Sequence, residues 1–238
     1  MSKNLLVIPV YNEAETIRGV MCELRRHYFG EVLIVDDGSS DASIESLGRC
    51  DMKRVNVLRH AENKGYGASL IDGFEYAIKH GFDKVVTMDC DWQHEPVQVP
   101  EFLEGLDHAD VVSGSRYLKM FLDDADAPPD RKEINRKITK RINEITGFNL
   151  TDAFCGFKGY RVGALKNLHL NEYGYAFPLQ FWVQAAHHHL SICEIPVKRI
   201  YKNMNRTFGN GLDNPEVRES YYLEVLKREQ EICQSTAW

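Results

Sequence analysis

Two carboxylates and an amide stand at alternate positions near the middle of this chain. Asp89, Asp91 and Gln93 follow the apolar run of residues 84–88. Carboxylate and amide oxygens are the ligands that a hard divalent cation prefers, and such a cation also binds phosphate oxygens. Acidic pairs also cap helices. The spacing alone therefore leaves two interpretations open, a metal site and a helix cap.

A second acidic pair, Asp36 and Asp37, follows the apolar run of residues 31–35. Such an aspartate can accept hydrogen bonds from a nucleobase N–H or from ribose hydroxyls, and it can equally cap the next helix. Residues 63–67 form a glycine-containing turn after the third predicted strand, without the third glycine of the dinucleotide fingerprint. This disfavours a Rossmann NAD site, and we expect Gly67 to allow close helix–sheet packing.

The first half of the chain alternates short apolar runs with amphipathic stretches, which is typical of a parallel sheet covered by helices. We expect helices over residues 13–28 and 67–80, where apolar side chains recur at helical spacing. The predicted strands cover residues 5–10, 31–35, 55–59, 84–88 and 110–113. Ligands of such sheets bind at the carboxyl ends of the strands, where the acidic residues of this sequence collect.

The second half begins with an acidic, proline-containing segment. We expect residues 118–130 to form a mobile loop, because its prolines disfavour a helix or a central strand. The following helix, residues 131–146, is rich in lysine and arginine, which indicates either a solvated face or a local site for anions. Further elements are predicted at residues 154–160 (strand), 177–189 (helix), 192–200 (strand) and 215–232 (helix).

Composition limits the class of protein. With 238 residues, 43% hydrophobic and 27% charged, the chain is not disordered, collagen-like or stapled by disulfides. A net charge of −6 argues against a protein that coats nucleic acid. The six cysteines include no C-x-x-C pair and indicate reduced, buried thiols in a cytoplasmic protein. No apolar run is long enough to span a bilayer, so a membrane substrate would have to be met at the surface.

Taken together, five ordered motifs closely resemble the family-2 inverting glycosyltransferases of the GT-A fold. They lie at residues 7–13, 35–41, 63–67, 89–94 and 114–117. The D-x-D-x-Q-H form, with residues 152–158 and 174–177, is most similar to the branch of dolichol-phosphate mannose synthases and polyprenyl-phosphate glycosyltransferases. The resemblance covers residues 4–200. It implies a GDP- or UDP-sugar donor, Mg²⁺ or Mn²⁺ as cofactor, and a polyprenyl-phosphate acceptor.

The resemblance also implies an organisation for the whole chain. We expect an α/β fold, a single Rossmann-like GT-A domain with a mainly parallel sheet flanked by helices and a small antiparallel addition. This domain covers residues 1–210, with a nucleotide-binding part (1–115) and an acceptor part (116–210), and a C-terminal helical extension follows at 211–238. The expected location is cytoplasmic, with peripheral association at the inner membrane face if the acceptor is a lipid.

Site residues carry over position by position. The resemblance implies nucleotide binding by Pro9, Tyr11, Glu13, Asp37 and Asp89, and metal binding by Asp89, Asp91 and Gln93. Phosphate and acceptor contacts fall to Arg116, Arg131, Arg136 and Arg206, since arginine suits bidentate phosphate contacts. The residues expected in catalysis are Asp89, Asp91, Arg116 and Asp152. At position 180 the chain has Gln180 where members of the branch often have an acid.

Two kinds of acceptor make different demands. A lipid phosphate is already an anion and needs no general base, whereas a hydroxyl acceptor needs a carboxylate such as Asp152 to take its proton. A sugar-nucleotidyltransferase is an alternative, although residues 9–13 are acidic and glycine-free where that class carries a glycine-rich basic loop. A non-catalytic nucleotide-sugar-binding protein is a third possibility, which turnover of a nucleotide sugar would exclude.

Overall fold

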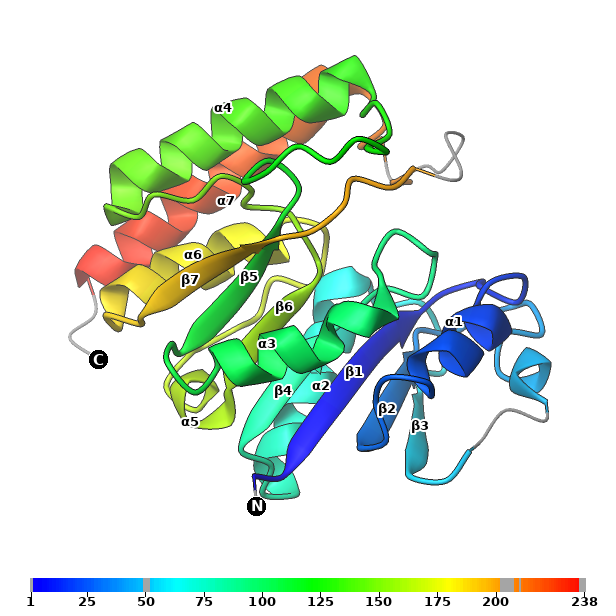
Figure 1. The fold of residues 1–238 in the computed structure, drawn as a ribbon. Helices are drawn as coiled ribbons and strands as arrows, with labels where there is room; N and C mark the ends of the chain where they lie inside the picture. Colours follow the sequence, from blue (N-terminus) through cyan, green and yellow to red (C-terminus); the bar gives the residue numbers. More distant parts are fainter. Residues whose placement is uncertain (1, 49–51, 202–207, 210, 236–238) are drawn as a thin grey trace.

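The computed structural model describes residues 2–48, 52–201, 208–209 and 211–235. At its centre lies a seven-stranded sheet with the strand order β3-β2-β1-β4-β6-β5-β7 (Figure 1). Neighbouring strands pair in parallel, except that β6 is antiparallel to both β4 and β5. The strands are β1 (Asn4–Val10), β2 (Glu31–Asp36), β3 (Val55–Arg59), β4 (Lys84–Thr87), β5 (Val111–Ser115), β6 (Lys158–Arg161) and β7 (Ile192–Pro196). The predicted parallel sheet with an antiparallel addition is confirmed.

Alternation along β1 directs side chains to two separate cores. Leu5 and Val7 pack into the core under α2 (Tyr66–Lys79), α5 (Val162–Leu165) and α6 (Phe177–His187). Leu6, Ile8 and Val10 pack into the opposite core under α1 (Ile17–Leu24) and α3 (Val99–Gly105). Two long helices, α4 (Pro129–Thr146) and α7 (Pro215–Ser235), pack on α6 and on each other (Figure 1). Two short 3₁₀ helices, Glu45–Leu47 and Pro96–Gln98, complete the elements.

The first helix is shorter than the predicted range of 13–28. The backbone N–H groups of Asn12, Glu13 and Ala14 donate to side chains of Ser39, Ser43 and Asp41. Asn12 also has a φ of +56°, which is outside helical geometry. These residues therefore link the end of β1 to the loop after β2, and the helix begins at Ile17.

The strand predicted at residues 154–160 begins later, at Lys158. The N–H of Phe154 donates to the side chain of Asp152, so this stretch turns back on itself before the strand pairs with β4 and β5. The strand predicted at 192–200 ends at Pro196. The other helices and strands differ from prediction only at their ends.

Gly67 allows a close contact, but not the one predicted. A Cβ atom on Gly67 would lie 2.1 Å from the carbonyl oxygen of Glu172, in the loop before α6, rather than against the sheet. The close helix–sheet contact is made six residues later on the same helix. There a Cβ atom on Gly73 would lie 2.6 Å from a methyl group of Val7 in β1.

The cysteines follow the prediction only in part. Cys90 and Cys155 are buried, whereas Cys193 and Cys233 are partly exposed and Cys22 is exposed. The expectation of buried thiols is therefore wrong for Cys22. Separately, no helix in the described part of the chain combines the length and the apolar character that a membrane span requires.

Candidate active site

The charged residues singled out from the sequence gather at the carboxyl edge of the sheet. Asp37 follows β2, Asp89 follows β4, and Arg116 follows β5. This edge also carries the irregular loops that connect the strands to α1, α2 and α4 (Figure 1). Parallel strands bring these segments together, which is the usual ligand site of an open α/β sheet.

The loop after β4 presents Asp89, Asp91 and Gln93. The Asp89 N–H donates to Nδ1 of His94 at 3.0 Å, and the Tyr66 hydroxyl donates to Asp89 Oδ1 at 3.3 Å. The Gln93 backbone and side-chain amides donate to the two Asp91 oxygens at 3.0 and 2.7 Å. The Asp89 side chain keeps 28% exposure. The three predicted metal ligands therefore share one short loop and are partly exposed to solvent.

This donor set fits a magnesium-type cation that is shared with a bound phosphate. Mg²⁺ is usually held by one or two carboxylates plus substrate phosphates rather than by a cage of protein ligands. Across residues 2–48, 52–201, 208–209 and 211–235, no three His, Cys, Asp or Glu side chains converge as a metal cluster. Two aspartates and a glutamine amide match the shared arrangement, with Asp89, Asp91 and Gln93 as the residues that would hold the ion.

Two neighbours that the sequence analysis did not single out shape the Asp89 loop. His94 is buried and stacks on Phe157, with ring centroids 5.1 Å apart. Gly156 passes so close that a Cβ atom there would lie 2.8 Å from Asp89 Oδ2 and 2.6 Å from the Tyr66 hydroxyl. A side chain at position 156 would therefore displace Asp89. His94 and Gly156 lie within the motifs at residues 89–94 and 152–158, but nothing in the sequence indicates these contacts.

Asp37 is bound on several sides. Its carboxylate accepts hydrogen bonds from the backbone N–H groups of Lys64 and Gly65 at 2.8 and 2.9 Å. His60 Nδ1 lies 2.6 Å from Asp37 Oδ1, and His60 Nε2 lies 2.6 Å from Asp72 Oδ2. The Asp37 side chain is only 4% exposed. Asp37 thus fixes the turn at residues 64–65, next to Tyr66, which contacts Asp89.

The other predicted nucleotide contacts lie at the end of β1, beside Asp37. Pro9 pairs in register with Val35 of β2, and the Asp37 N–H donates to the Val10 carbonyl at 2.8 Å. Tyr11 follows directly and is 48% exposed. Glu13 accepts a hydrogen bond from the Thr16 hydroxyl at 2.7 Å. The structure brings these residues to the edge that carries Asp37 and Asp89.

Arg116 and Asp152 form a bidentate ion pair at the end of β5. Arg116 Nε and one terminal nitrogen donate to the two Asp152 oxygens at 2.6 and 3.0 Å. Asn135 of α4 donates to Asp152 Oδ1 at 2.8 Å. Burial by itself raises the pKa of Asp152, but the Arg116 charge and these hydrogen bonds outweigh burial and lower the pKa to about 2. Asp152 is therefore a buried anion, already saturated with donors.

The remaining predicted arginines are spread out. The Arg131 guanidinium lies 4.7 Å from the ring centroid of Phe208, and Arg218 of α7 lies 4.6 Å from the same ring. Arg136 points to Glu133 on its own helix, at 2.7 Å, and its side chain is 66% exposed. Arg206 lies outside the described residues. The structure thus places Arg131 near the start of α4 and leaves Arg136 on the outer surface.

The basic character of α4 is partly compensated by acidic neighbours. Lys140 and Arg141 face Glu144, and Lys137 reaches Glu219 of α7 at 3.1 Å. The opposite flank of α4 is apolar: Ile134, Ile138 and Ile142 are buried. The helix therefore packs on the core through its isoleucines, and ion pairs reduce the net charge of its exposed face.

The loop between β5 and α4 is irregular, as predicted, and its middle is attached to the segment after β7. Arg199 donates through its backbone N–H to Asp124 Oδ1 at 2.8 Å and through Nε to the Ala125 carbonyl at 2.6 Å. The first part of the loop projects apolar side chains into solvent, with exposures of 44% at Leu118, 85% at Met120 and 110% at Leu122. This apolar surface was not predicted, because acids and prolines dominate the sequence of the segment.

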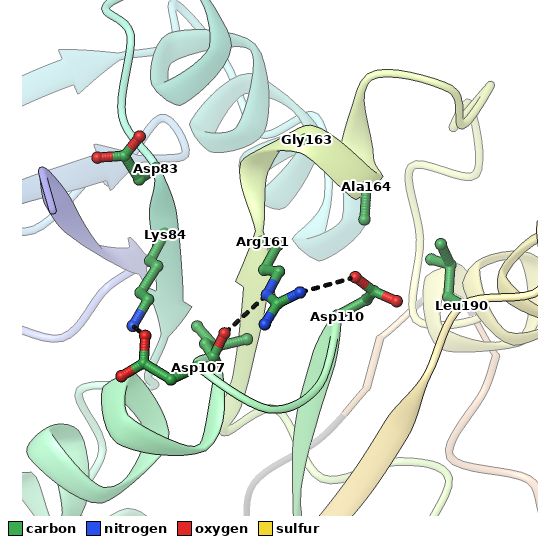
Figure 2. Close-up of a pocket in the computed structure, with 9 residues that line it drawn as sticks. Asp83, Lys84, Asp107, Asp110, Arg161, Gly163, Ala164 and Leu190 are labelled. Atoms are coloured by element: carbon green, nitrogen blue, oxygen red, sulfur yellow. Dashed lines mark hydrogen bonds and ion pairs between the residues drawn. The ribbon is translucent and has the colours of Figure 1, made fainter.

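A cavity of about 420 Å³ lies at the other end of the strands (Figure 2). Four of its charged side chains form two ion pairs: Lys84 with Asp107 at 2.6 Å, and Arg161 with Asp110 at 3.6 Å. Asp83 and Lys84 mark the beginning of β4, opposite to the end that carries Asp89. This cavity contains none of the residues predicted for the site.

Comparison with known proteins identifies the family. The family model described as "Glycosyl transferase family 2" matches residues 5–168. The chain belongs to glycosyl transferase family 2. The matched part contains Asp37, Asp89 and Asp152, whereas α6, β7 and α7 lie after it. The glycosyltransferase resemblance noted in the sequence is confirmed.

Curated relatives place this family-2 chain in the polyprenyl-phosphate branch. It is 31% identical over 216 residues to the undecaprenyl-phosphate mannosyltransferase of Micrococcus luteus, covering 87% of each chain. It is 28% identical over 204 residues to the polyprenol monophosphomannose synthase of Mycolicibacterium smegmatis, covering 82% of this chain and 76% of the relative.

Solved structures confirm the GT-A fold of this family-2 glycosyltransferase. The glucosyl-3-phosphoglycerate synthase of Mycobacterium tuberculosis, crystallised with Mn²⁺, UDP and glucosyl-3-phosphoglycerate, superimposes with a TM-score of 0.74 at 16% identity. The match covers 97% of this chain and 80% of the synthase. At this identity the likeness extends to the fold alone.

Proposed function

We propose that this protein transfers a hexose, with inversion, from a GDP- or UDP-sugar to a polyprenyl phosphate, with Mg²⁺ or Mn²⁺ as cofactor. The choice of acceptor rests on the burial and ionisation of Asp152. It is fully buried, its pKa is lowered to about 2, and Arg116 occupies both of its oxygens. A carboxylate in this state is a poor proton acceptor, so an acceptor that arrives as an anion suits the site better than a hydroxyl.

The donor occupies the edge formed by β1, β2 and β4 in this proposal. Pro9, Tyr11, Glu13 and Asp37 bind the base and ribose, and Asp89 lies between the ribose and the diphosphate. Asp89, Asp91 and Gln93 hold the divalent ion, which when bound neutralises charge on the diphosphate leaving group. The partly exposed, oxygen-rich loop at Asp89 and the family membership support this assignment.

Transfer then requires only positioning and charge. An oxygen of the acceptor phosphate attacks the anomeric carbon from the face opposite to the nucleotide, and the bond to the diphosphate oxygen breaks as that oxygen takes the electron pair. Arg116, held by Asp152, and Arg131, at the start of α4, are the cations we place beside the acceptor phosphate. No proton is exchanged, because the nucleophile is already an anion.

The exposed loop supports a lipid acceptor. Leu118, Met120 and Leu122 project from the segment that follows Arg116, and soluble proteins rarely expose such side chains together without a contact to make. The relatives named after undecaprenyl and polyprenol phosphates act on lipids of this class. We propose that this loop meets the membrane surface where the lipid phosphate is presented.

Two successive measurements test the proposal. Thermal shifts with GDP- and UDP-sugars in the presence of Mn²⁺ first select the donor, because a ligand that binds only the folded state raises the apparent stability. Transfer is then measured to a polyprenyl phosphate in vesicles and, in parallel, to the soluble acceptor phosphoglyceric acid and to a sugar hydroxyl. We expect product only with the polyprenyl phosphate, with inverted anomeric configuration. Product with a hydroxyl acceptor instead would overturn the acceptor assignment and return Asp152 to the role of base.

A further inference from the structure

The loop before α6 packs against residues 65–68, which continue from the turn bound by Asp37. The Ala68 N–H donates to the Tyr173 carbonyl at 3.1 Å. A Cβ atom on Gly65 would lie 2.4 Å from that same carbonyl oxygen. Gly65 also donates its N–H to Asp37. The backbone that binds Asp37 and carries Tyr66 therefore rests directly on residues 172–174.

The side chain of Gln180 is hydrogen-bonded to this loop. Its side-chain oxygen accepts the N–H groups of Asn171 and Glu172 at 2.7 and 2.8 Å. Its amide nitrogen donates to Asn171 Oδ1 at 2.8 Å and to Glu229 Oε1 of α7 at 2.9 Å. The side chain is 1% exposed. All four hydrogen-bonding positions of the amide are occupied, two of them by the backbone of the loop.

Glu229 is the matching partner on α7. Its carboxylate is 1% exposed and accepts from Gln180, from Gln184 at 3.3 Å, and from Arg228 at 3.2 Å. Arg228 also donates to Glu172 at 2.9 Å, so α7 contacts the same loop a second time. A carboxylate at position 180 would face Glu229 acceptor to acceptor, which is costly in a buried site.

We infer that Gln180 and Glu229 are positioning residues for the donor site. They act through residues 171–174 on the turn at residues 65–68, and from there on Asp37 and on the Tyr66–Asp89 contact. This inference rests on the proposed function for its choice of ligand. It assigns to the C-terminal helix a role in donor binding, although α7 contributes no residue to the site itself.

The test exchanges the two groups. Gln180→Glu brings two acceptors together, and the double variant Gln180→Glu/Glu229→Gln restores a donor–acceptor pair with its direction reversed. Binding of GDP and UDP in the presence of Mn²⁺ is measured by calorimetry, well below the melting temperature. We expect the single variant to weaken nucleotide binding roughly fivefold, a size typical of coupling between separated sites, and the double variant to recover most of it.

A second readout needs no ligand. Hydrogen exchange at the amides of Lys64, Gly65 and Ala68 should accelerate in Gln180→Glu and return to the wild-type rate in the double variant, because these amides are bonded to Asp37 and Tyr173. If the wild-type protein binds neither nucleotide, the proposed function fails, yet the exchange rates still decide this inference.

Leu226→Ala is the matched control. Leu226 lies on the same helix, is buried and is part of the apolar core, so its truncation lowers stability by leaving a cavity and removes no polar contact. We expect it to lower the melting temperature while nucleotide affinity and exchange at residues 64–68 stay as in the wild type. The inference is overturned if Gln180→Glu behaves like Leu226→Ala, or if the double variant recovers neither readout.

Discussion

The donor and acceptor halves of the proposed site hold their aspartates in opposite ways. At the donor half, Asp89 follows β4 in an open loop with 28% of its side chain exposed. At the acceptor half, Asp152 is fully buried and locked to Arg116. The first arrangement suits a group that shares a cation with a ligand, and the second suits a group that orients an arginine. Under the proposed function, this difference means that the acceptor half supplies charge rather than proton transfer.

The sharpest way to test the donor half is Asp91→Asn. The change keeps the shape of the side chain and removes a charge from the proposed metal ligand, so we expect turnover of the selected nucleotide sugar to fall about 100- to 1,000-fold. Initial rates are measured over a Mn²⁺ titration. Asp107→Asn is the control, because Asp107 lies at the opposite end of the strands, and it should leave the rate unchanged. Full activity of Asp91→Asn, or activity unaffected by chelator, would contradict the metal assignment.

Asp152→Asn tests the acceptor half. Removing one partner leaves Arg116 without its buried counter-charge, and we expect the free energy of unfolding at neutral pH to fall by about 3 kcal/mol, as measured by urea denaturation. The variant should also lose a pH dependence. In the wild type the pKa of Asp152 is lowered from 3.8 to about 2, so this group stabilises the fold above about pH 4, and its contribution is lost as pH falls towards 2.

That shift corresponds to about 2 kcal/mol of pH-dependent stability. The difference in unfolding free energy between wild type and Asp152→Asn should therefore shrink as the pH is lowered from 4 to 2. A difference that stays constant with pH would show that Asp152 is not held as an anion. In that case the contrast between the two halves would disappear.

Asp37→Ala should have a smaller effect that separates binding from chemistry. A base or ribose contact, and the turn that Asp37 fixes through Lys64 and Gly65, act equally in the ground and transition states. We expect the KM for the donor to rise about tenfold with little change in kcat, since a lost charged hydrogen bond has about that effect. A normal KM with a collapsed kcat would instead move Asp37 to the reacting centre.

The smallest expected effect concerns the outer face of α4. Because Arg136 and Lys140 are paired with Glu133 and Glu144, reversing both charges (Arg136→Glu/Lys140→Glu) should weaken binding to anionic vesicles only about threefold at low salt. Donor affinity should not change. Arg26→Glu/Lys79→Glu is the control, since Arg26 is likewise exposed and paired with a glutamate three residues before it. Equal losses in both variants would mean that net charge, and not α4, directs the protein to the vesicle.

Local periodicity and motif spacing determined much of this protein. The continuous apolar runs at residues 5–10 and 31–35 predicted two buried strands, and isoleucines at helical spacing form the inner flank of α4. The carboxylates at Asp37 and Asp89 were predictable because each directly follows an apolar run, and strand ends of a parallel sheet meet at one edge. The departures, such as the late start of α1, arise where side chains from the next loop bind the backbone.

Tertiary structure alone decided how the charges are used. Arg116 and Asp152 are far apart in sequence and meet because β6 enters the sheet between β4 and β5 in the antiparallel direction. Gln180 and Glu229 meet because α7 folds back onto α6. A sequence shows that such groups are charged or polar, but their pKa values and their partners depend on burial and distance. Those quantities exist only once distant segments have packed together.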